Sequence, residues 1–243
     1  MLGLAQMVSA KTACTSMSIP RPEPTARLRT FQSWYGCESD PSSTGQDADD
    51  SYGGSFTSGA ASFYDPTLLM AEGLGSDRPF IFVGLNYRLG ALGFPYGSEI
   101  AENNAANLGL RDVQKGLEWV QDHIWAFGGN PDQVTVFGES AGAILISLLY
   151  LQPDLKLFKS AIMESGAQST APLGPTGSTW QGPYNALVDY AGCNTTASTN
   201  STTGNSTSAA NFTSSFDCLK SIPASQLLLA QERTQELPQY SLA

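Results

Sequence analysis

Histidine and basic residues are scarce in this chain. Its 243 residues include one histidine, and 12 Lys and Arg stand against 22 Asp and Glu, which gives a net charge of −10. This acidic balance excludes the basic patch with which proteins bind nucleic acid or anionic lipid surfaces. No apolar run approaches the roughly 20 residues of a membrane-spanning helix. We therefore expect no nucleic-acid partner and no integral membrane segment.

Metal-binding and targeting patterns are missing as well. The four cysteines, Cys14, Cys37, Cys193 and Cys218, are too widely spaced for a zinc site. Residues 1–18 lack the basic start and sustained apolar run of a signal peptide. Even so, a charged fraction of only 14%, with many Ser, Thr and Gly, is more typical of secreted than of cytosolic chains.

Residues 1–51 differ in character from the rest of the chain. They contain Pro20, Pro22, Pro24 and Pro41 and an acidic stretch at residues 47–50, and they show no sustained period of two or 3.6. We expect this segment to be irregular or disordered, with Cys14 and Cys37 in an undetermined state. A folded domain is predicted over residues 52–243.

From residue 52 onward, strand and helix patterns alternate. The apolar run at residues 80–87 predicts a strand buried on both faces. Apolar residues at steps of three and four predict an amphipathic helix over residues 107–124: Leu110, Val113, Leu117, Val120 and Ile124. Further strands are expected at residues 134–137 and 159–164, and helices at 141–150, 184–190 and 225–233. The alternation predicts an α/β domain with a mostly parallel sheet.

The most informative motif is Gly-Glu-Ser-Ala-Gly at residues 138–142. It lies between a predicted strand and a predicted helix, where Ser140 would sit on a sharp turn that lifts its hydroxyl out of the sheet. The flanking glycines suit such a turn because it needs small residues and unusual backbone angles. A serine nucleophile also needs a histidine base, but the single histidine, His123, lies on the helix before the motif.

Three further motifs place this serine in a family context. They are Asn-Tyr-Arg-Leu-Gly at residues 86–90, Asn-Leu-Gly-Leu-Arg-Asp at 107–112 and Phe-Gly-Gly-Asn-Pro at 127–131. Together with the Ser140 motif they resemble the type-B carboxylesterase/lipase family, which includes fungal lipases and cholinesterases. The resemblance runs from about residue 52 to about residue 229. It implies an α/β-hydrolase fold that is incomplete here, with roughly the N-terminal half of the mostly parallel sheet and its flanking helices.

The resemblance also implies roles for individual residues. Ser140 matches the nucleophile that forms an acyl-enzyme with a carboxylic ester, and water then resolves that intermediate. Gly54, Ser55 and Ala141 match the positions whose backbone N–H groups form the oxyanion hole. The implied substrate is a small-molecule or lipid ester, and no cofactor or metal is implied. Glu139 resembles a residue lining the family's gorge.

Two departures from the family pattern concern activity. The acid and histidine of the triad should follow Ser140 in the chain, so they are expected beyond residue 243, and His123 is expected to be a surface residue. Residues 46–51 are mostly acidic where the family has an apolar strand ahead of the oxyanion loop. We therefore expect a sheet without a strand near its centre, an oxyanion loop without its anchor, and an inactive chain on its own.

A loop near the C-terminus carries the signs of secretion. Cys193 and Cys218 resemble a disulfide of the family, and four Asn-x-Ser/Thr sequons lie between them: Asn194, Asn200, Asn205 and Asn211. This predicts a disulfide-closed, glycosylated loop and an extracellular location. Chance sequons in a Ser/Thr-rich segment are the alternative.

Two alternatives to a carboxylic ester hydrolase remain open. A non-catalytic, cholinesterase-like binding or adhesion protein would explain the absent histidine. A gene fragment would explain the abrupt change at residues 51–52. In the carboxylic ester hydrolase, Arg88 and Asp112 are expected to form structural ion pairs beneath the site, as scaffold rather than as catalytic groups. The oligomeric state is not predicted.

Overall fold

The computed structural model describes residues 29–34, 54–61, 64–170, 178–194 and 212–235. Cys14, Cys37, Asn200, Asn205 and Asn211 lie outside the described residues. The chain divides into two compact units, one of residues 1–89 and 109–172 and the other of residues 90–108 and 173–243. The single domain predicted over residues 52–243 is therefore shared between two units.

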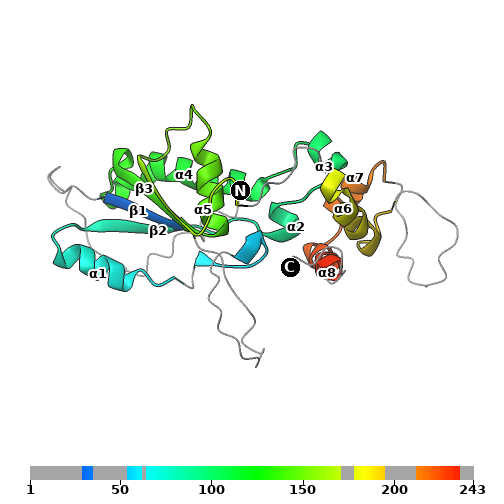
Figure 1. Ribbon diagram of the computed structural model, residues 1–243, viewed down its shortest axis with the longest axis horizontal. Coiled ribbons are helices and arrows are strands. Elements are labelled where there is room, and N and C mark those ends of the chain that lie inside the picture. Colours follow the sequence, from blue (N-terminus) through cyan, green and yellow to red (C-terminus); the bar gives the residue numbers. More distant parts are fainter. Residues whose placement is uncertain (1–28, 35–53, 62–63, 171–177, 195–211, 236–243) are drawn as a thin grey trace, which may run out of the picture. The chain divides into compact units, whose positions relative to one another are not determined.

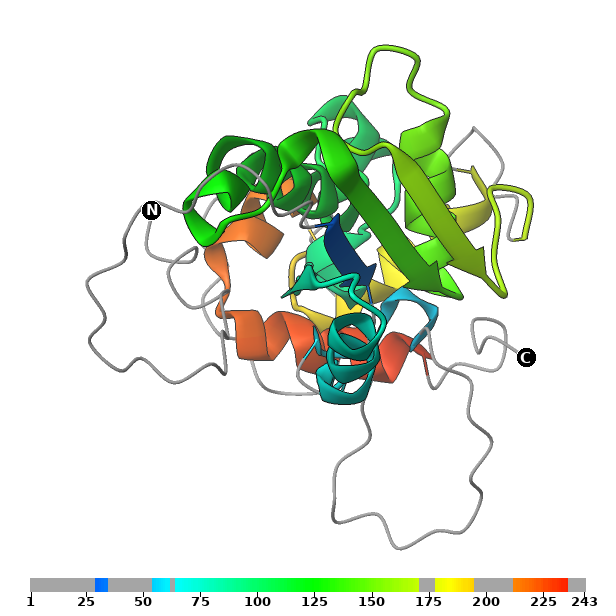
Figure 2. The same cartoon turned by 90° about the vertical axis from the view of Figure 1, so that its left-hand side faces the viewer.

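The first unit is built on a four-stranded sheet in the order β2-β1-β3-β4. The strands are β1 (Arg29–Trp34), β2 (Phe80–Gly84), β3 (Val134–Glu139) and β4 (Ser160–Glu164). All neighbouring pairs are parallel, as predicted. Figure 1 shows β1 between β2 and β3, and Figure 2 shows β3 and β4 running side by side in the same direction.

The strand β1 corrects two sequence-based expectations. Residues 29–34 lie inside the segment predicted to be irregular, yet they form a strand that pairs with both β2 and β3. The sheet therefore has the inner strand that the acidic residues 46–51 cannot supply. The sequence Arg-Thr-Phe-Gln-Ser-Trp is rich in residues that favour strands. Six residues between proline-rich and acidic stretches give too short a periodic signal to find by pattern alone.

Helices accompany this sheet. The α-helices are α1 (Thr67–Gly75), α4 (Leu108–His123) and α5 (Ala141–Tyr150), and the 3₁₀ helices are η1 (Gly54–Phe56), η3 (Ile124–Phe127) and η4 (Pro131–Gln133). The predicted stripe of α4 is confirmed, since Val113, Leu117 and Val120 are fully buried. β2 is different from its prediction: it lies at a sheet edge and its residues are only half-buried.

The second unit is helical. It contains α2 (Gly90–Gly93), α3 (Ser98–Glu102), α6 (Ser178–Tyr190), α7 (Ser215–Ser221) and α8 (Ala224–Gln235). Its core is formed by Ile100, Tyr184, Leu187, Val188, Ala191, Cys193, Cys218, Leu219 and Ala230. Cys193 and Cys218 form a disulfide with their Cα atoms 5.5 Å apart. Among the described residues, no helix has the length and apolar character needed to cross a membrane.

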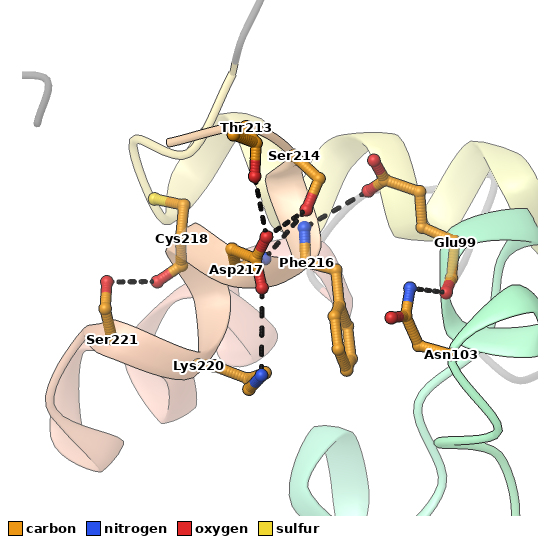
Figure 3. A network of polar contacts seen from close by, with 9 residues as sticks. All are labelled: Glu99, Asn103, Thr213, Ser214, Phe216, Asp217, Cys218, Lys220 and Ser221. Atoms are coloured by element: carbon orange, nitrogen blue, oxygen red, sulfur yellow. Dashed lines mark hydrogen bonds and ion pairs between the residues drawn. The ribbon is translucent and has the colours of Figure 1, made fainter. Parts of the chain in front are cut away.

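Polar contacts around Glu99 join three helices of this unit, and Figure 3 shows the contact between α3 and α7. The Glu99 carboxylate on α3 accepts hydrogen bonds from the Tyr184 hydroxyl of α6 at 2.5 Å and from the Phe216 N–H of α7 at 3.2 Å. Ser214 caps α7, since its hydroxyl oxygen accepts from the Asp217 N–H at 3.1 Å. Burial, reinforced by Glu99, raises the pKa of Tyr184, so its hydroxyl keeps its proton to a higher pH than a free tyrosine does.

Removal of the disulfide is expected to destabilise the second unit. The bridge closes a loop with a sequence separation of 25, and in the chain-entropy model such a cross-link stabilises by about 3 kcal/mol. We expect Cys193→Ala/Cys218→Ala to lower the free energy of unfolding by about this amount, measured by urea denaturation. Adding reductant to the parent chain should shift its unfolding midpoint towards that of the variant. A variant with the same unfolding midpoint as the parent would contradict the prediction.

Candidate active site

Ser140 sits at a strained turn between β3 and α5. Its backbone angles are φ 48° and ψ −116°, which a non-glycine residue rarely adopts. The Ser140 N–H donates to the carbonyl oxygen of Glu164 at the end of β4, at 2.8 Å. Its own carbonyl oxygen accepts from the Ile144 N–H at 3.0 Å, the first hydrogen bond of α5. Contacts on both sides therefore hold the strained turn.

Two glycines allow the backbone to close around this turn. A Cβ on Gly138 would lie 2.6 Å from the backbone carbonyl carbon of Gly142 in α5. A Cβ on Gly166, just after β4, would lie 2.5 Å from the Ser140 carbonyl oxygen. Because backbone atoms occupy both positions, neither site has room for a side chain. These close approaches explain the glycine at residue 138.

The loop predicted to bind the oxyanion forms the 3₁₀ helix η1. Gly54, Ser55 and Phe56 all have positive φ, at 54°, 45° and 66°. The Gly54 carbonyl oxygen accepts from the Thr57 N–H at 2.7 Å and from the Ser58 N–H at 3.1 Å. η1 also contacts α5, the helix that follows Ser140. The fold thus brings this loop to the helix on which the serine motif ends.

Ala141 begins α5 and is almost fully buried. N–H groups in the first turn of a helix have no acceptor within the helix, and the helix dipole places partial positive charge there. A negatively charged oxygen beside Ser140 would therefore meet favourable electrostatics. The predicted donors Gly54, Ser55 and Ala141 lie on two elements that are in contact.

Glu139 lies next to the serine in an unfavourable environment. Its Oε2 is buried and has no hydrogen-bond partner among the described residues. Its neighbour across the parallel pair β3–β4 is Glu164. Burial, and then repulsion from Glu164, raise the pKa of Glu139. This carboxyl group therefore takes up a proton more readily than a solvent-exposed glutamate does.

A pH-dependent gain in stability is expected for Glu139→Gln. Because the folded-state pKa lies above the ordinary value of 4.5, the folded chain binds this proton more tightly than the unfolded chain does. The parent should lose stability as the pH rises through the interval between the two values. The amide avoids that loss, so we expect no difference at pH 4 and a gain of about 1 kcal/mol at pH 8.

Thermal unfolding at the two pH values measures this difference. Glu164→Gln is the matched control, because it relieves the repulsion but not the burial and should give a smaller gain. A destabilised Glu139→Gln protein at pH 8 would contradict the prediction.

His123 is placed where the sequence predicts. It is exposed at the end of α4, with its ring centroid 5.4 Å from that of Trp119. Among the described residues, no group of three or more His, Cys, Asp and Glu side chains is arranged to hold a metal ion. No histidine follows Ser140 in this sequence, so the base of a Ser–acid–His triad is not among these residues.

Contacts made by the Asn-Tyr-Arg motif fix the loop after β2. Arg88 and Asp112 form the predicted ion pair, with Nε to Oδ2 and Nη2 to Oδ1 distances of 2.7 Å. This hydrogen bonding raises the pKa of Arg88. The side chain of Asn86 has a contact that the sequence does not predict: its Oδ1 accepts from the Ala61 N–H at 2.8 Å. The sequence signal at Asn86 is its place in the Asn-Tyr-Arg-Leu-Gly motif, two residues after the end of β2.

The comparison with known families agrees with the motifs. A model of the carboxylesterase family matches residues 51–242. The chain belongs to the carboxylesterase family. This confirms the resemblance found in the sequence.

Individual relatives are lipases and esterases. The chain is 40% identical to Lipase 2 of Geotrichum candidum over 190 residues, covering 74% of this chain and 31% of that protein. It is 38% identical to Secreted lipase 1 of Botryotinia fuckeliana, covering 78% and 31%. It is 50% identical to para-nitrobenzyl esterase of Bacillus subtilis over a shorter stretch, 49% of this chain and 24% of the enzyme.

Solved esterase structures share the fold of this chain. A PNB esterase superposes with a TM-score of 0.63 at 32% identity, over 88% of this chain and 37% of that one. Aspergillus niger EstA gives a TM-score of 0.62 at 26% identity, over 86% and 33%. The parallel sheet and its helices are therefore part of an α/β-hydrolase fold. The chain spans between about a quarter and a third of the length of the curated relatives named above.

Proposed function

We propose that this carboxylesterase-family chain carries the nucleophile and the oxyanion hole of a carboxylic ester hydrolase. Ser140 Oγ attacks the ester carbonyl carbon, the alcohol leaves, and water hydrolyses the acyl-enzyme. Backbone N–H groups of Gly54, Ser55 and Ala141 donate to the oxyanion. The observation that carries the proposal is the strained backbone of Ser140, held between β3 and α5.

The proposal assigns the general base to a polypeptide region outside these residues. The Ser140 proton needs an acceptor during attack, and neither His123 nor Glu139 meets the requirement. His123 is exposed at the C-terminal end of α4, and Glu139 Oε2 has no hydrogen-bond partner among the described residues, so it makes no hydrogen bond with the Ser140 hydroxyl. The chain covers 31% of Lipase 2 of Geotrichum candidum, so most of that relative lies outside the matched region, where an acid and a histidine have room. The chain alone is therefore expected to be close to inactive.

The substrate class and location follow from the relatives and from the second unit. Relatives named as lipases and as a para-nitrobenzyl esterase support a small-molecule or lipid ester as substrate. The disulfide and a relative named as a secreted lipase support an extracellular protein. Glycosylation is proposed at the four sequons, Asn194, Asn200, Asn205 and Asn211. Of these, Asn194 is exposed beside the disulfide and donates to Asp189 at 2.7 Å.

A soluble base tests the proposed function on the 243-residue chain. Imidazole is added to the chain with p-nitrophenyl butyrate, and Ser140→Ala is run in parallel to subtract hydrolysis by imidazole itself. We expect release of p-nitrophenol that depends on Ser140 and rises with imidazole. In other serine hydrolases, the groups that remain after loss of a triad member still give about 10³–10⁴-fold over water. Equal rates for the parent and Ser140→Ala at every imidazole concentration would overturn the proposal.

A non-catalytic binding or adhesion protein is the second candidate. It predicts equal rates for the parent and Ser140→Ala in the same assay. The imidazole experiment therefore decides between the two functions.

A further inference from the structure

We infer that Asn86 is a positioning residue that fastens the oxyanion loop to the rest of the catalytic unit. This inference rests on the proposed function, because it concerns the backbone donors of Gly54 and Ser55. Its starting point is the hydrogen bond from the Ala61 N–H to Asn86 Oδ1, at 2.8 Å. That contact joins two segments 25 residues apart in the chain.

On one side of this contact lies the oxyanion loop. The Gly54 carbonyl oxygen accepts from the N–H groups of Thr57 and Ser58, and also from the Thr57 hydroxyl at 2.9 Å. These bonds fold residues 54–58 into a tight turn. Ala61 follows the turn after two residues, so a fixed Ala61 limits how far the turn can move.

On the other side, the loop that carries Asn86 is anchored to α4. Two residues beyond Asn86, Arg88 makes its two side-chain hydrogen bonds to Asp112, and its backbone N–H also donates to Asp112, at 3.0 Å. Leu85 is buried against α4, where a Cβ on Gly116 would lie 2.5 Å from the Leu85 side chain. Asn86 therefore projects from a loop with support on both sides.

Further contacts run alongside the Asn86 hydrogen bond. A Cβ on Gly84 would lie 3.2 Å from that of Ala61, so the end of β2 packs closely on the same segment. The Tyr64 N–H donates to the Ala61 carbonyl oxygen at 3.3 Å. Burial, and then the nearby Tyr64, raise the pKa of Tyr87 to about 12. Tyr64 and Tyr87 are a second pair of neighbouring residues from the two segments. Asn86 supplies the directional bond in this contact.

The position of the loop matters because oxyanion donors act only over a short range. Donors contribute when they lie about 2.7–3.1 Å from the developing oxygen, and loss of one typically costs 10²–10³-fold in rate. Without the Asn86 oxygen, the Ala61 N–H would turn to solvent and the loop could shift by a fraction of an ångström. Attack by Ser140 would slow, but ground-state binding of the ester would not change.

Two substitutions separate the acceptor from the shape of the side chain. Asn86→Leu keeps a similar shape and removes the oxygen, whereas Asn86→Asp keeps an oxygen that can accept from Ala61. With imidazole and p-nitrophenyl butyrate, we expect Asn86→Leu to lower the Ser140-dependent kcat about 10–100-fold, with KM unchanged within about twofold. Asn86→Asp should stay within about threefold of the parent. An unaffected Asn86→Leu, or an Asn86→Asp as slow as Asn86→Leu, would overturn the inference.

A parent chain without Ser140-dependent turnover would reject the proposed function. Hydrogen exchange tests the role of Asn86 even in that case, because it does not depend on activity. Mass spectrometry of the full chain should show faster amide exchange in residues 54–61 for Asn86→Leu. Exchange in β3 and α5 should match the parent, and Asn86→Asp should behave as the parent throughout. Unchanged exchange in residues 54–61 would contradict a positioning role for Asn86, whatever the activity.

Discussion

Gly138→Ala is expected to destabilise the first unit by about 2–3 kcal/mol and to reduce Ser140-dependent turnover by about 100-fold. The added Cβ would lie 2.6 Å from the carbonyl carbon of Gly142, 2.8 Å from its oxygen and 2.7 Å from the Ile146 side chain. Two of these three atoms belong to the backbone and cannot rotate away. The start of α5 must therefore shift from β3, and overpacking of this kind typically costs 1–3 kcal/mol.

The loss of turnover has a separate origin from the loss of stability. Ser140 lies between Gly138 and Gly142, so any movement of α5 displaces the hydroxyl and the Ala141 N–H together. A misplacement of about 1 Å can cost about 100-fold in rate. Turnover is measured with imidazole and p-nitrophenyl butyrate, under conditions where the variant remains folded by circular dichroism.

Gly75→Ala is the matched control for this variant. Gly75 is the last residue of α1, and no heavy atom lies within 4 Å of a Cβ built there. The same chemical change should therefore be neutral or stabilising by up to about 1 kcal/mol, since alanine favours the helix. Equal stability for Gly138→Ala and Gly75→Ala would contradict the close packing described at the turn.

Leu117→Ala is expected to destabilise the first unit by about 2–5 kcal/mol. Leu117 is fully buried and lies in the middle of the apolar stripe of α4. Truncation removes the favourable free energy of burying these side-chain atoms away from water. It also leaves a cavity that the surrounding structure fills only in part. Urea denaturation measures the change in the free energy of unfolding.

Leu68→Ala controls for the substitution itself. Leu68 on α1 is 84% exposed, so truncation there should change stability by less than about 0.5 kcal/mol. The pair tests whether α4 buries the stripe that its sequence predicts. Similar effects at the two positions would show that this stripe is not the core of the unit.

The elements around Ser140 could be predicted well from the sequence. α5 has the predicted bounds, residues 141–150, and β3 and β4 lie where their apolar runs indicate. α4 is confirmed because four of the five predicted apolar residues recur at helical spacing within its sixteen residues and give a strong periodic signal. Each of these elements is specified by local pattern, and the glycines at the turn mark the boundary between β3 and α5.

Other parts of the fold depend on contacts that the local sequence does not record. β1 is a strand because β2 and β3 pair with it on both sides, and its six residues are too few to predict alone. α3 and α7 are five and seven residues long, too short for a periodic pattern to predict them. A hydrogen bond between Glu99 and Phe216 joins the two helices, and the disulfide links α7 to Cys193. The division into two units depends equally on distant contacts.

The candidate site shows the same distinction. Ser140 and the loop at Gly54 and Ser55 belong to short, recognisable motifs, so the sequence suffices to propose them. The bond between Asn86 and Ala61 joins residues 25 positions apart, and no pairwise pattern in a single sequence reveals it. The unfavourable environment of Glu139 arises in the same way, from the register that places it beside Glu164.

The central claim is that Ser140 is a nucleophile held ready at the end of β3. Its most direct test is covalent capture: the 243-residue chain is treated with a fluorophosphonate in the presence of imidazole, digested and mapped by mass spectrometry. The account predicts one adduct, on Ser140, that forms faster as imidazole is added and is absent from Ser140→Ala. An adduct on other residues only, or no adduct on a chain shown to be folded, would contradict it.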